Sequence, residues 1–369
     1  MSLEKCTGRA AGLRTEAAVY RTARQLKAAN AGVRVLFYWS LTQAGIGCYA
    51  ANATLAAHPE WLLRNDTGAV VRPPRVDLTV AAAAEWWLSV PMDAARGWAP
   101  GVIDGVLADG AGYDKVPGVS AARNAAQYAA KRGLLARLQA AFDAPGAGLA
   151  ARGGGLVLAN GLSEYDQDPA DPHNRGLARS GARGVMNEHF AVFEQLNHTT
   201  GAVNATKASD ALDNIAWAAA QRDAQGRPTL VFCSFWPGPV VAVGKGGWPA
   251  WPGGAQPAAG DMAAWKKALA DNLPWALAAY LTVAETNTFM TYAAWYELHQ
   301  GFVTCPDDPG SCAAPAGYYP ALKRALGAPA APRRRLGGGG YRWTRRFEHA
   351  RVAFDLLDRN ATAITWLQT

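Results

Sequence analysis

Short apolar runs alternate along this chain with longer stretches in which apolar residues recur every three or four positions. An apolar run bounded by turn residues is typical of a parallel strand covered on both faces, and the wider spacing is typical of a helix. The clearest run is Gly105–Ala108 (Gly-Val-Leu-Ala), which Asp109 and Gly110 end with a turn. The pattern therefore predicts a regular alternation of strands and helices.

Eight segments are predicted to be strands: Ser2–Lys5, Val33–Trp39, Arg75–Thr79, Val102–Ala108, Gly155–Asn160, Gly184–Asn187, Thr229–Phe235 and Asn287–Tyr292. The main predicted helices are Glu16–Asn30, Val80–Val90 (which Pro91 is expected to end), Ser120–Phe142 and Asp261–Ala284, with further helical segments up to Gln221. Eight such strand–helix units close as a (β/α)8 TIM barrel, which is the predicted fold class. An open doubly wound sheet is the alternative, although no Gly-x-Gly-x-x-Gly turn follows an early strand. Ser2–Cys6 has the pattern of a strand's end, so we expect the first strand to lack its beginning.

The last part of the chain has a different pattern. Polar and apolar residues alternate from Tyr341 to Leu356 and again from Thr362 to Trp366, which predicts two or three antiparallel strands. The Gly- and Pro-rich segment Leu326–Gly340, which contains Arg333-Arg334-Arg335, is predicted to be a solvated linker. The predicted organisation is thus a barrel domain over residues 1–325 and a small β-rich appendage over residues 341–369.

Composition limits the classes of function. The chain has 369 residues and a formal net charge of +7, and its basic residues are mostly Arg in an Ala- and Gly-rich background. We interpret this charge as compositional bias, so no nucleic-acid partner is predicted. No apolar stretch of about 18 residues occurs, so no membrane span is predicted. The 14 Trp residues suit a sugar-binding cleft, where flat aromatic faces are useful, although many are expected in the core.

Two features favour a secretory context. Asn-x-Ser/Thr sequons are more frequent than chance predicts, at Asn52, Asn65, Asn197, Asn204 and Asn360. Cys305 and Cys312 flank a turn-rich hexapeptide and are predicted to form a disulfide, with Cys6 and Cys48 as a second candidate pair. The N-terminus has no signal peptide, so we expect a secreted protein whose N-terminal sequence is truncated here.

Several short segments of the chain share a pattern with known proteins: His58–Leu63, Val76–Thr79 with Glu85–Trp87, Asp104–Gly110, Pro320–Pro329 and Tyr341 with Arg346–His349. These segments resemble TIM-barrel glycoside hydrolases, most closely a group of uncharacterised glycosyl-hydrolase-like proteins. In the wider retaining α-glucosidase and α-galactosidase clans, an acid on strand four is the nucleophile and an acid on strand six is the acid/base. The resemblance implies these roles for Asp109 and Glu188, which fall on the fourth and sixth predicted strands. Leu107 departs from the pattern, because those clans usually carry an aromatic residue or Lys at that position.

Two carboxyl groups are also what the chemistry requires. One protonates the leaving oxygen, and the other attacks the anomeric carbon or activates water. Asp109 and Glu188 are the candidates, because strand ends of a barrel meet at its active-site face. The alternatives are that Asp109 caps the following loop and that Glu188 begins a helix. Whether the enzyme retains or inverts configuration stays open.

Further residues near predicted strand ends are candidates for sugar contacts: Trp39, Asp77, Asn160, Glu164, Trp236 and Glu285. Trp39 is equally suited to the core. Asp104 is predicted to hold backbone at the opposite end of the barrel, and Cys233 to be an inert buried thiol. The sequence contains no metal-binding spacing, and no cofactor is predicted. The predicted function is hydrolysis of O-glycosidic bonds, and the alternative is a catalytically silent barrel that binds glycans.

Overall fold

The computed structural model describes residues 2–3, 12–43, 47–144, 149, 154–163, 170–190, 203–223, 225–235, 262–292, 320–337 and 340–367. The chain forms two compact units. Unit 1 comprises Met1–Met186 and Ala220–Thr229, and unit 2 comprises Asn187–Ala219 and Leu230–Thr369.

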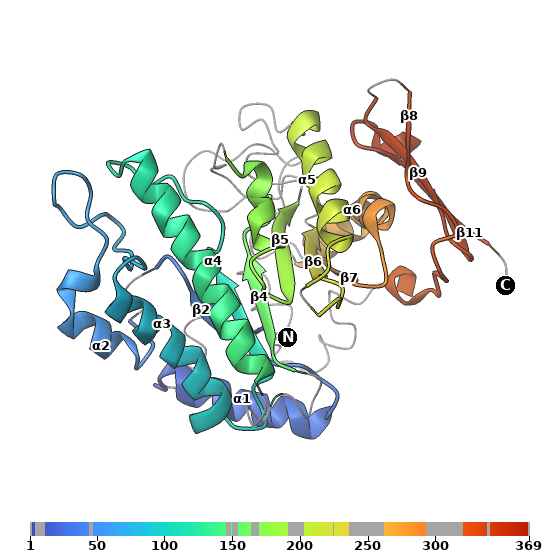
Figure 1. Ribbon diagram of the computed structural model, residues 1–369. Coiled ribbons are helices and arrows are strands. Elements are labelled where there is room, and N and C mark those ends of the chain that lie inside the picture. The colour runs from blue at the N-terminus through green and yellow to red at the C-terminus, as the bar shows by residue number, and fades with distance from the viewer. Residues whose placement is uncertain are drawn as a thin grey trace. The chain divides into compact units, whose positions relative to one another are not determined.

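The main sheet has seven strands in chain order, and every strand pairing described in it is parallel. The strands are β1 (Ser2–Leu3), β2 (Leu36–Ser40), β3 (Gly105–Asp109), β4 (Leu156–Asn160), β5 (Gly184–Phe190), β6 (Leu230–Phe235) and β7 (Thr288–Tyr292). A separate sheet of four antiparallel strands lies in unit 2 (Figure 1). The predicted mixed α/β class, with a parallel sheet and a small antiparallel sheet, is confirmed.

One predicted strand, Arg75–Thr79, is wrong. β2 pairs directly with β3, with Leu36 opposite Gly105 and Ser40 opposite Asp109, so no strand lies between them. The segment forms only isolated antiparallel bridges, including one between Leu62 and Val76. Its alternating polarity suits a half-exposed extended chain better than a strand buried on both faces. Asp109 therefore ends the third strand, and Glu188 lies on the fifth.

The α-helices are α1 (Thr15–Ala29), α2 (Asn52–Ala57), α3 (Ala81–Asp93), α4 (Ala121–Asp143), α5 (Ala205–Ala219) and α6 (Met262–Val283). Short 3-10 helices cover Pro59–Trp61, Pro172–Leu177, Pro320–Lys323 and Arg359–Ala361, and a π-helix covers Ala94–Trp98. The prediction that Pro91 ends the second helix is wrong, because Pro91 lies inside α3. Its missing N–H is tolerated near the helix end, where the wider π turn begins at Ala94.

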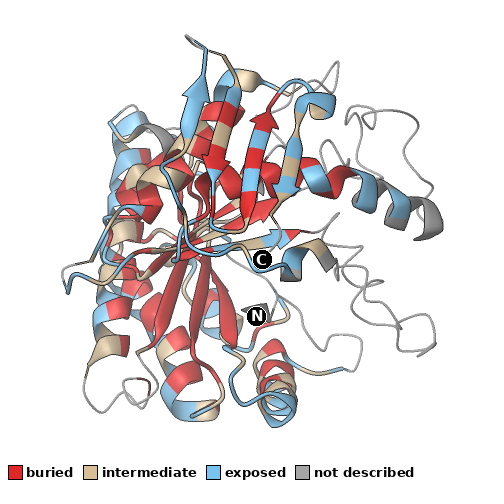
Figure 2. Ribbon diagram, turned by 90° about the vertical axis from the view of Figure 1, so that its right-hand side faces the viewer, coloured by how far each residue is buried: buried red, intermediate tan, exposed pale blue. Residues whose placement is uncertain are grey.

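The core of unit 1 lies between the sheet and its helices. Every residue of β2 and β4 is buried, and β3 is buried up to Ala108, as Figure 2 shows for the parallel sheet. Trp39 of β2 donates its indole N–H to the carbonyl oxygen of Trp87 in α3 at 3.2 Å, and the Trp87 indole donates to the Ser40 carbonyl at 2.7 Å. In α4, the Gln139 amide donates to the Gly155 carbonyl at 2.9 Å and accepts from the Val157 N–H at 3.0 Å. These paired bonds attach α3 to β2 and α4 to β4.

The antiparallel sheet of unit 2 consists of β8 (Arg334–Leu336), β9 (Arg342–Arg346), β10 (Ala350–Asp355) and β11 (Ala363–Trp366), in the order β11-β10-β9-β8. Buried and exposed positions alternate along β9 and β10, which is typical of a sheet covered on one face (Figure 2). Trp343 and Phe354 are on the buried face, and Trp275 of α6 packs on Phe354 with ring centroids 5.6 Å apart.

The arginine run 333–335 is not the solvated linker that the sequence predicted. Arg333 forms an ion pair with Asp213 of α5, and Arg334 and Arg335 lie in β8. The Arg335 guanidinium lies 5.3 Å from the ring centroid of Trp343. Arg333 is thus held by an ion pair, and Arg334 and Arg335 are part of a folded sheet. The local Pro- and Gly-rich composition does not reveal either the ion pair or the strand.

In the part of the chain that the structure describes, no helix is long and apolar enough to cross a membrane.

Cys233 in β6 is a buried free thiol whose pKa is raised by burial, as expected of an inert residue. Cys48 is disulfide-bonded, but Cys6 lies outside the described residues, as do Cys305 and Cys312. Both proposed pairings stay predictions.

Asp104 fastens the amino end of the sheet in unit 1, as predicted. It directly precedes β3, and its Oδ2 accepts from the Val35 N–H at 2.7 Å and from Lys27 Nζ of α1 at 2.6 Å. Its main-chain carbonyl accepts from the Leu156 N–H at 3.0 Å. One buried residue thereby connects the chain entering β2, the start of β4 and α1.

We expect Asp104→Ala to lower the free energy of unfolding by about 3 kcal/mol, because it leaves the largely buried Lys27 ammonium without its counter-charge. Urea denaturation of the variant and the wild type measures this loss. Asp93→Ala is the control, since Asp93 is an exposed acid that makes none of these contacts. An equal, small effect of the two substitutions would contradict the role given to Asp104.

Candidate active site

The side chains of Tyr38, Asp109 and Asn160 meet near the carboxyl ends of β2, β3 and β4. The register places Ser40 opposite Asp109, and Ala108 opposite Ala159, so that Asp109 and Asn160 are adjacent at the strand ends. Side chains alternate along a strand, so Tyr38 lies on the same face as Ser40. The register of parallel strands thus brings residues distant in the sequence to one end of unit 1.

Asp109 is held by two neutral donors. The Tyr38 hydroxyl donates to its Oδ2, and the Asn160 amide donates to its Oδ1 at 2.9 Å. Among the described residues, no cation forms an ion pair with Asp109. The carboxylate is therefore fixed in orientation by both neighbouring strands, and none of the described cations forms a salt bridge with it.

Glycines allow the chain to turn sharply after Asp109. Gly110 has a φ of +65°, and a Cβ there would lie 2.7 Å from Thr42 Oγ1. Gly161, which follows Asn160, has a φ of +140°, and a Cβ there would lie 2.4 Å from the Gly112 backbone nitrogen. A side chain at Gly161 would push the turns after β3 and β4 apart, and a side chain at Gly110 would push against Thr42, which follows β2.

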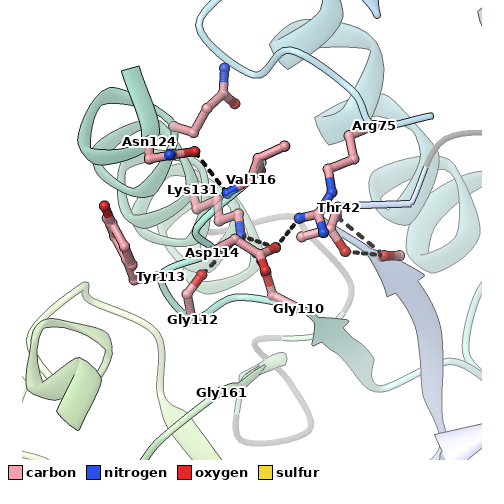
Figure 3. Close-up of polar contacts among 12 residues, drawn as sticks. Thr42, Arg75, Gly110, Gly112, Tyr113, Asp114, Val116, Asn124, Lys131 and Gly161 are labelled. Atoms are coloured by element: carbon pink, nitrogen blue, oxygen red, sulfur yellow. Dashed lines mark hydrogen bonds and ion pairs between the residues drawn. The ribbon is translucent and has the colours of Figure 1, made fainter. Parts of the chain in front are cut away.

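The buried Lys131 binds the turn that follows β3 (Figure 3). Lys131 of α4 donates to the carbonyl oxygens of Gly110 at 2.8 Å and Gly112 at 2.9 Å, and its Nζ lies 3.6 Å from Asp114 Oδ2. Arg75 forms an ion pair with the same Asp114 carboxylate. Burial lowers the pKa of Lys131 below its ordinary value of 10.5, and the nearby Asp114 charge acts in the opposite direction. Lys131 is thus a positioning residue for the loop that follows Asp109.

A cavity of about 10 Å³ adjoins this ion cluster, lined in part by Arg75, Asp114, Gln127, Tyr128 and Lys131. That volume holds about one water molecule. Sites for small organic ligands are far larger, typically ~300–1,000 Å³. The cavity therefore belongs to the support of the loop and does not accommodate a sugar.

Asp77 and Trp39 do not join Asp109. Asp77 Oδ1 accepts from the Thr79 N–H at 3.1 Å, the Thr79 hydroxyl and the Gln127 amide, both at 2.5 Å. These bonds tie the segment before α3 to α4. Trp39 is buried against Trp87, on the opposite face of β2 from Tyr38. The structure thus places Trp39 in the core, which was the alternative left open by the sequence.

The remaining candidates lie elsewhere or outside the described residues. Glu188 is half-buried within β5, which continues to Phe190, so the alternative that Glu188 begins a helix is wrong. Glu285 precedes β7, at the amino end of that strand, and accepts from Arg345 Nη2 at 2.5 Å. Glu164 and Trp236 lie outside the described residues. Of the predicted sugar-contact residues in unit 1, the structure brings Asn160 to Asp109.

Tyr38 and Lys131 are parts of this site that were not predicted from the sequence. Tyr38 could have been found from the alternation of side chains along a strand. It is one position before Trp39, so the two side chains point to opposite faces, and when Trp39 is in the core Tyr38 is on the face of Asp109. Lys131 lies in an Ala-rich helix, and nothing in the local sequence distinguishes it from a solvated lysine. Its role depends on the turn that α4 packs against.

No family model and no curated protein matches this chain.

We expect Lys131→Met to lower the free energy of unfolding by about 2 kcal/mol at neutral pH, because two buried carbonyl groups lose their donor. The stability difference between wild type and variant should also depend on pH. Just below pH 10.5 the unfolded chain holds a proton on Lys131 that the folded protein has partly released. The unfolded state then binds more protons, so the wild type gains stability relative to the variant as pH rises through this window.

Chemical denaturation at a series of alkaline pH values measures this difference. A difference that stays constant as pH approaches 10.5 would show that Lys131 titrates normally in the folded protein.

Proposed function

We propose that this protein is a glycoside hydrolase in which Asp109 acts directly at the anomeric carbon. The observation that carries the proposal is the Asp109 carboxylate at a strand end, oriented by Tyr38 and Asn160 and in no described ion pair. Asp104, at the other end of the same strand, shows the contrast, because Lys27 takes up its charge. A carboxylate that is fixed but not neutralised is suited to a cationic, oxocarbenium-like transition state.

The second carboxyl in this proposal belongs to Glu188. Glu188 lies in β5, and the resemblance to glycoside hydrolases implies the acid/base role for it. Its half-buried side chain is compatible with a proton donor, and Asp109 then serves as the nucleophile or as the base that activates water.

The proposal includes a barrel of the (β/α)8 type. Parallel strands that follow one another in chain order, with helices between most of them, are the arrangement from which such barrels are built. The carboxyl-end position of Asp109 supports it, because barrel enzymes carry their chemistry at that end.

A secretory location is part of the same proposal. Asn204 and Asn360 lie in sequons and are exposed, so both are accessible to glycosylation. A partner that carries carbohydrate fits this location, and a catalytically silent glycan-binding protein is the competing outcome of the experiments below.

Asp109→Asn should reduce hydrolysis by at least about a thousandfold while leaving the fold intact, because the amide keeps the shape of the carboxyl and cannot act as nucleophile or base. A panel of dinitrophenyl glycosides, followed by absorbance, measures the activity, and thermal unfolding checks the fold. Asp93→Asn, at an exposed helix-end acid, is the matched control.

Equal activity of Asp109→Asn and wild type would remove Asp109 from the mechanism. If the wild type hydrolyses no member of the panel but binds glycan arrays as tightly as the variant does, the silent binding protein is favoured.

If Glu188 is the general acid, Glu188→Gln should lose most activity on substrates with poor leaving groups. Dinitrophenolate leaves without protonation, whereas a sugar alcohol needs the proton. The ratio of kcat/KM between a dinitrophenyl glycoside and a natural disaccharide should therefore rise by about a hundredfold in the variant. A uniform loss on both substrates would instead assign Glu188 to sugar positioning or support.

A further inference from the structure

The exposed face of the antiparallel sheet in unit 2 carries a cluster of arginines. In β9, Trp343 and Arg345 are buried, whereas Thr344 and Arg346 alternate with them and point to the other face. The register places Arg346 opposite Arg351 of β10. This face therefore presents two arginines side by side on neighbouring strands.

Small residues form the floor beside them. Thr344 lies opposite Ala353 of β10, and Ala353 lies opposite Ala363 of β11. Arg334 of β8 lies opposite Thr344 and ends this row. Arg334 therefore borders the row of small side chains on the β8 side. The Arg346–Arg351 pair lies two residues further along β9 and β10, about 7 Å from the row.

These residues line a groove of about 420 Å³. Its lining includes Arg334, Arg346 and Arg351 together with Ala353 and Thr365. The volume is in the range of sites that hold small organic ligands, ~300–1,000 Å³. It is suited to one or two sugar rings and not to the surface of a macromolecule.

The three arginines of the groove are not neutralised within the described sheet. No ion pair or side-chain hydrogen bond joins Arg334, Arg346 or Arg351 to another described residue. The acids nearby are used elsewhere: Asp355 pairs with Arg342, Glu348 lies 3.8 Å from His349, and Asp358 accepts from the Asn360 N–H. Like charges directly opposite each other on neighbouring strands are unfavourable. An oxyanion bound between Arg346 and Arg351 would remove this repulsion.

We propose that this groove binds a short acidic oligosaccharide, with carboxylate or sulfate groups held by Arg346, Arg351 and Arg334. Guanidinium groups bind planar or tetrahedral oxyanions through paired N–H donors. Thr344 and Thr365 supply hydroxyl groups for sugar oxygens, and the alanine floor lets a ring approach the sheet. The site lies in the antiparallel sheet and the residues just before β8, all in unit 2, so it goes beyond the proposed hydrolysis at Asp109 and does not depend on it.

A nucleic acid fits this face less well. Single strands bind on aromatic side chains that stack with their bases, but the described aromatics of β9 and β10, Trp343 and Phe354, are on the buried face. Duplexes bury ~1,000–2,500 Å² of protein surface, which is far more than a groove of this size provides.

The experiment measures binding of size-defined heparin oligosaccharides to the full chain by calorimetry. Oligogalacturonate provides carboxylates without sulfates, and dextran oligosaccharides provide neither. The wild type should bind heparin or oligogalacturonate and not dextran, and raising the salt from about 0.05 M to about 0.2 M should weaken binding. The double variant Arg346→Gln/Arg351→Gln should weaken binding about tenfold, and Arg346→Lys/Arg351→Lys, which keeps the charge, should weaken it less.

Arg335→Gln is the matched control, because Arg335 is on the same β8 strand as Arg334 but packs over Trp343 on the other face. It should change the affinity less than twofold, and thermal unfolding should confirm that every variant is folded. An equal loss in Arg335→Gln, equal binding of dextran, or tighter binding of a single-stranded oligonucleotide of matched charge would each overturn the proposal. Binding that persists in Asp109→Asn separates this site from the proposed hydrolytic one.

Discussion

The in-register parallel pairing of β2, β3 and β4 determines which polar side chains meet in unit 1. Because the hydrogen-bonded ladder aligns the three strands residue by residue, their amino ends and their carboxyl ends each form a common level. At the amino end, the Asp104 carboxylate forms an ion pair with Lys27 and accepts a hydrogen bond from the Val35 N–H. At the carboxyl end, the partners of the Asp109 carboxylate among the described residues are the neutral donors Tyr38 and Asn160. The same strand thus has a structural acid at one end and a reactive candidate at the other.

The loop that follows Asp109 depends on this pairing and stabilises it in return. The glycine turns after β3 and β4 approach so closely that side chains would separate them, and Lys131 binds the carbonyl oxygens of the first turn from α4. A buried ammonium is unfavourable unless it is well bonded. Its two carbonyl acceptors and the Asp114 carboxylate meet that requirement, so the helix fixes the backbone beside Asp109 without competing for its carboxylate.

Most of the strand and helix order follows from the sequence, because covered parallel strands are continuous apolar runs. Arg75–Thr79 was the exception: its alternating pattern is compatible with a strand, and only the direct pairing of β2 with β3 excludes it. Asp109 could be found because an acid after an apolar run has no packing role. Tyr38 could have been found from the alternation of side chains along its strand, but Lys131 could not, since its role arises from the tertiary contact of α4 with the turn after β3. The arginines of β8 were also misjudged, because neighbouring glycines and prolines dominate the local pattern.

The central claim is that Asp109 faces the reacting carbon of a bound sugar. Labelling with cyclitol epoxides of several sugar configurations tests it most directly, because an epoxide opened in a glycosidase site forms an ester with the carboxylate that faces it. Peptide mapping by mass spectrometry identifies the modified residue. The account predicts an adduct on Asp109 that is absent in Asp109→Asn. An adduct on another carboxyl group, with Asp109 unmodified, would contradict it.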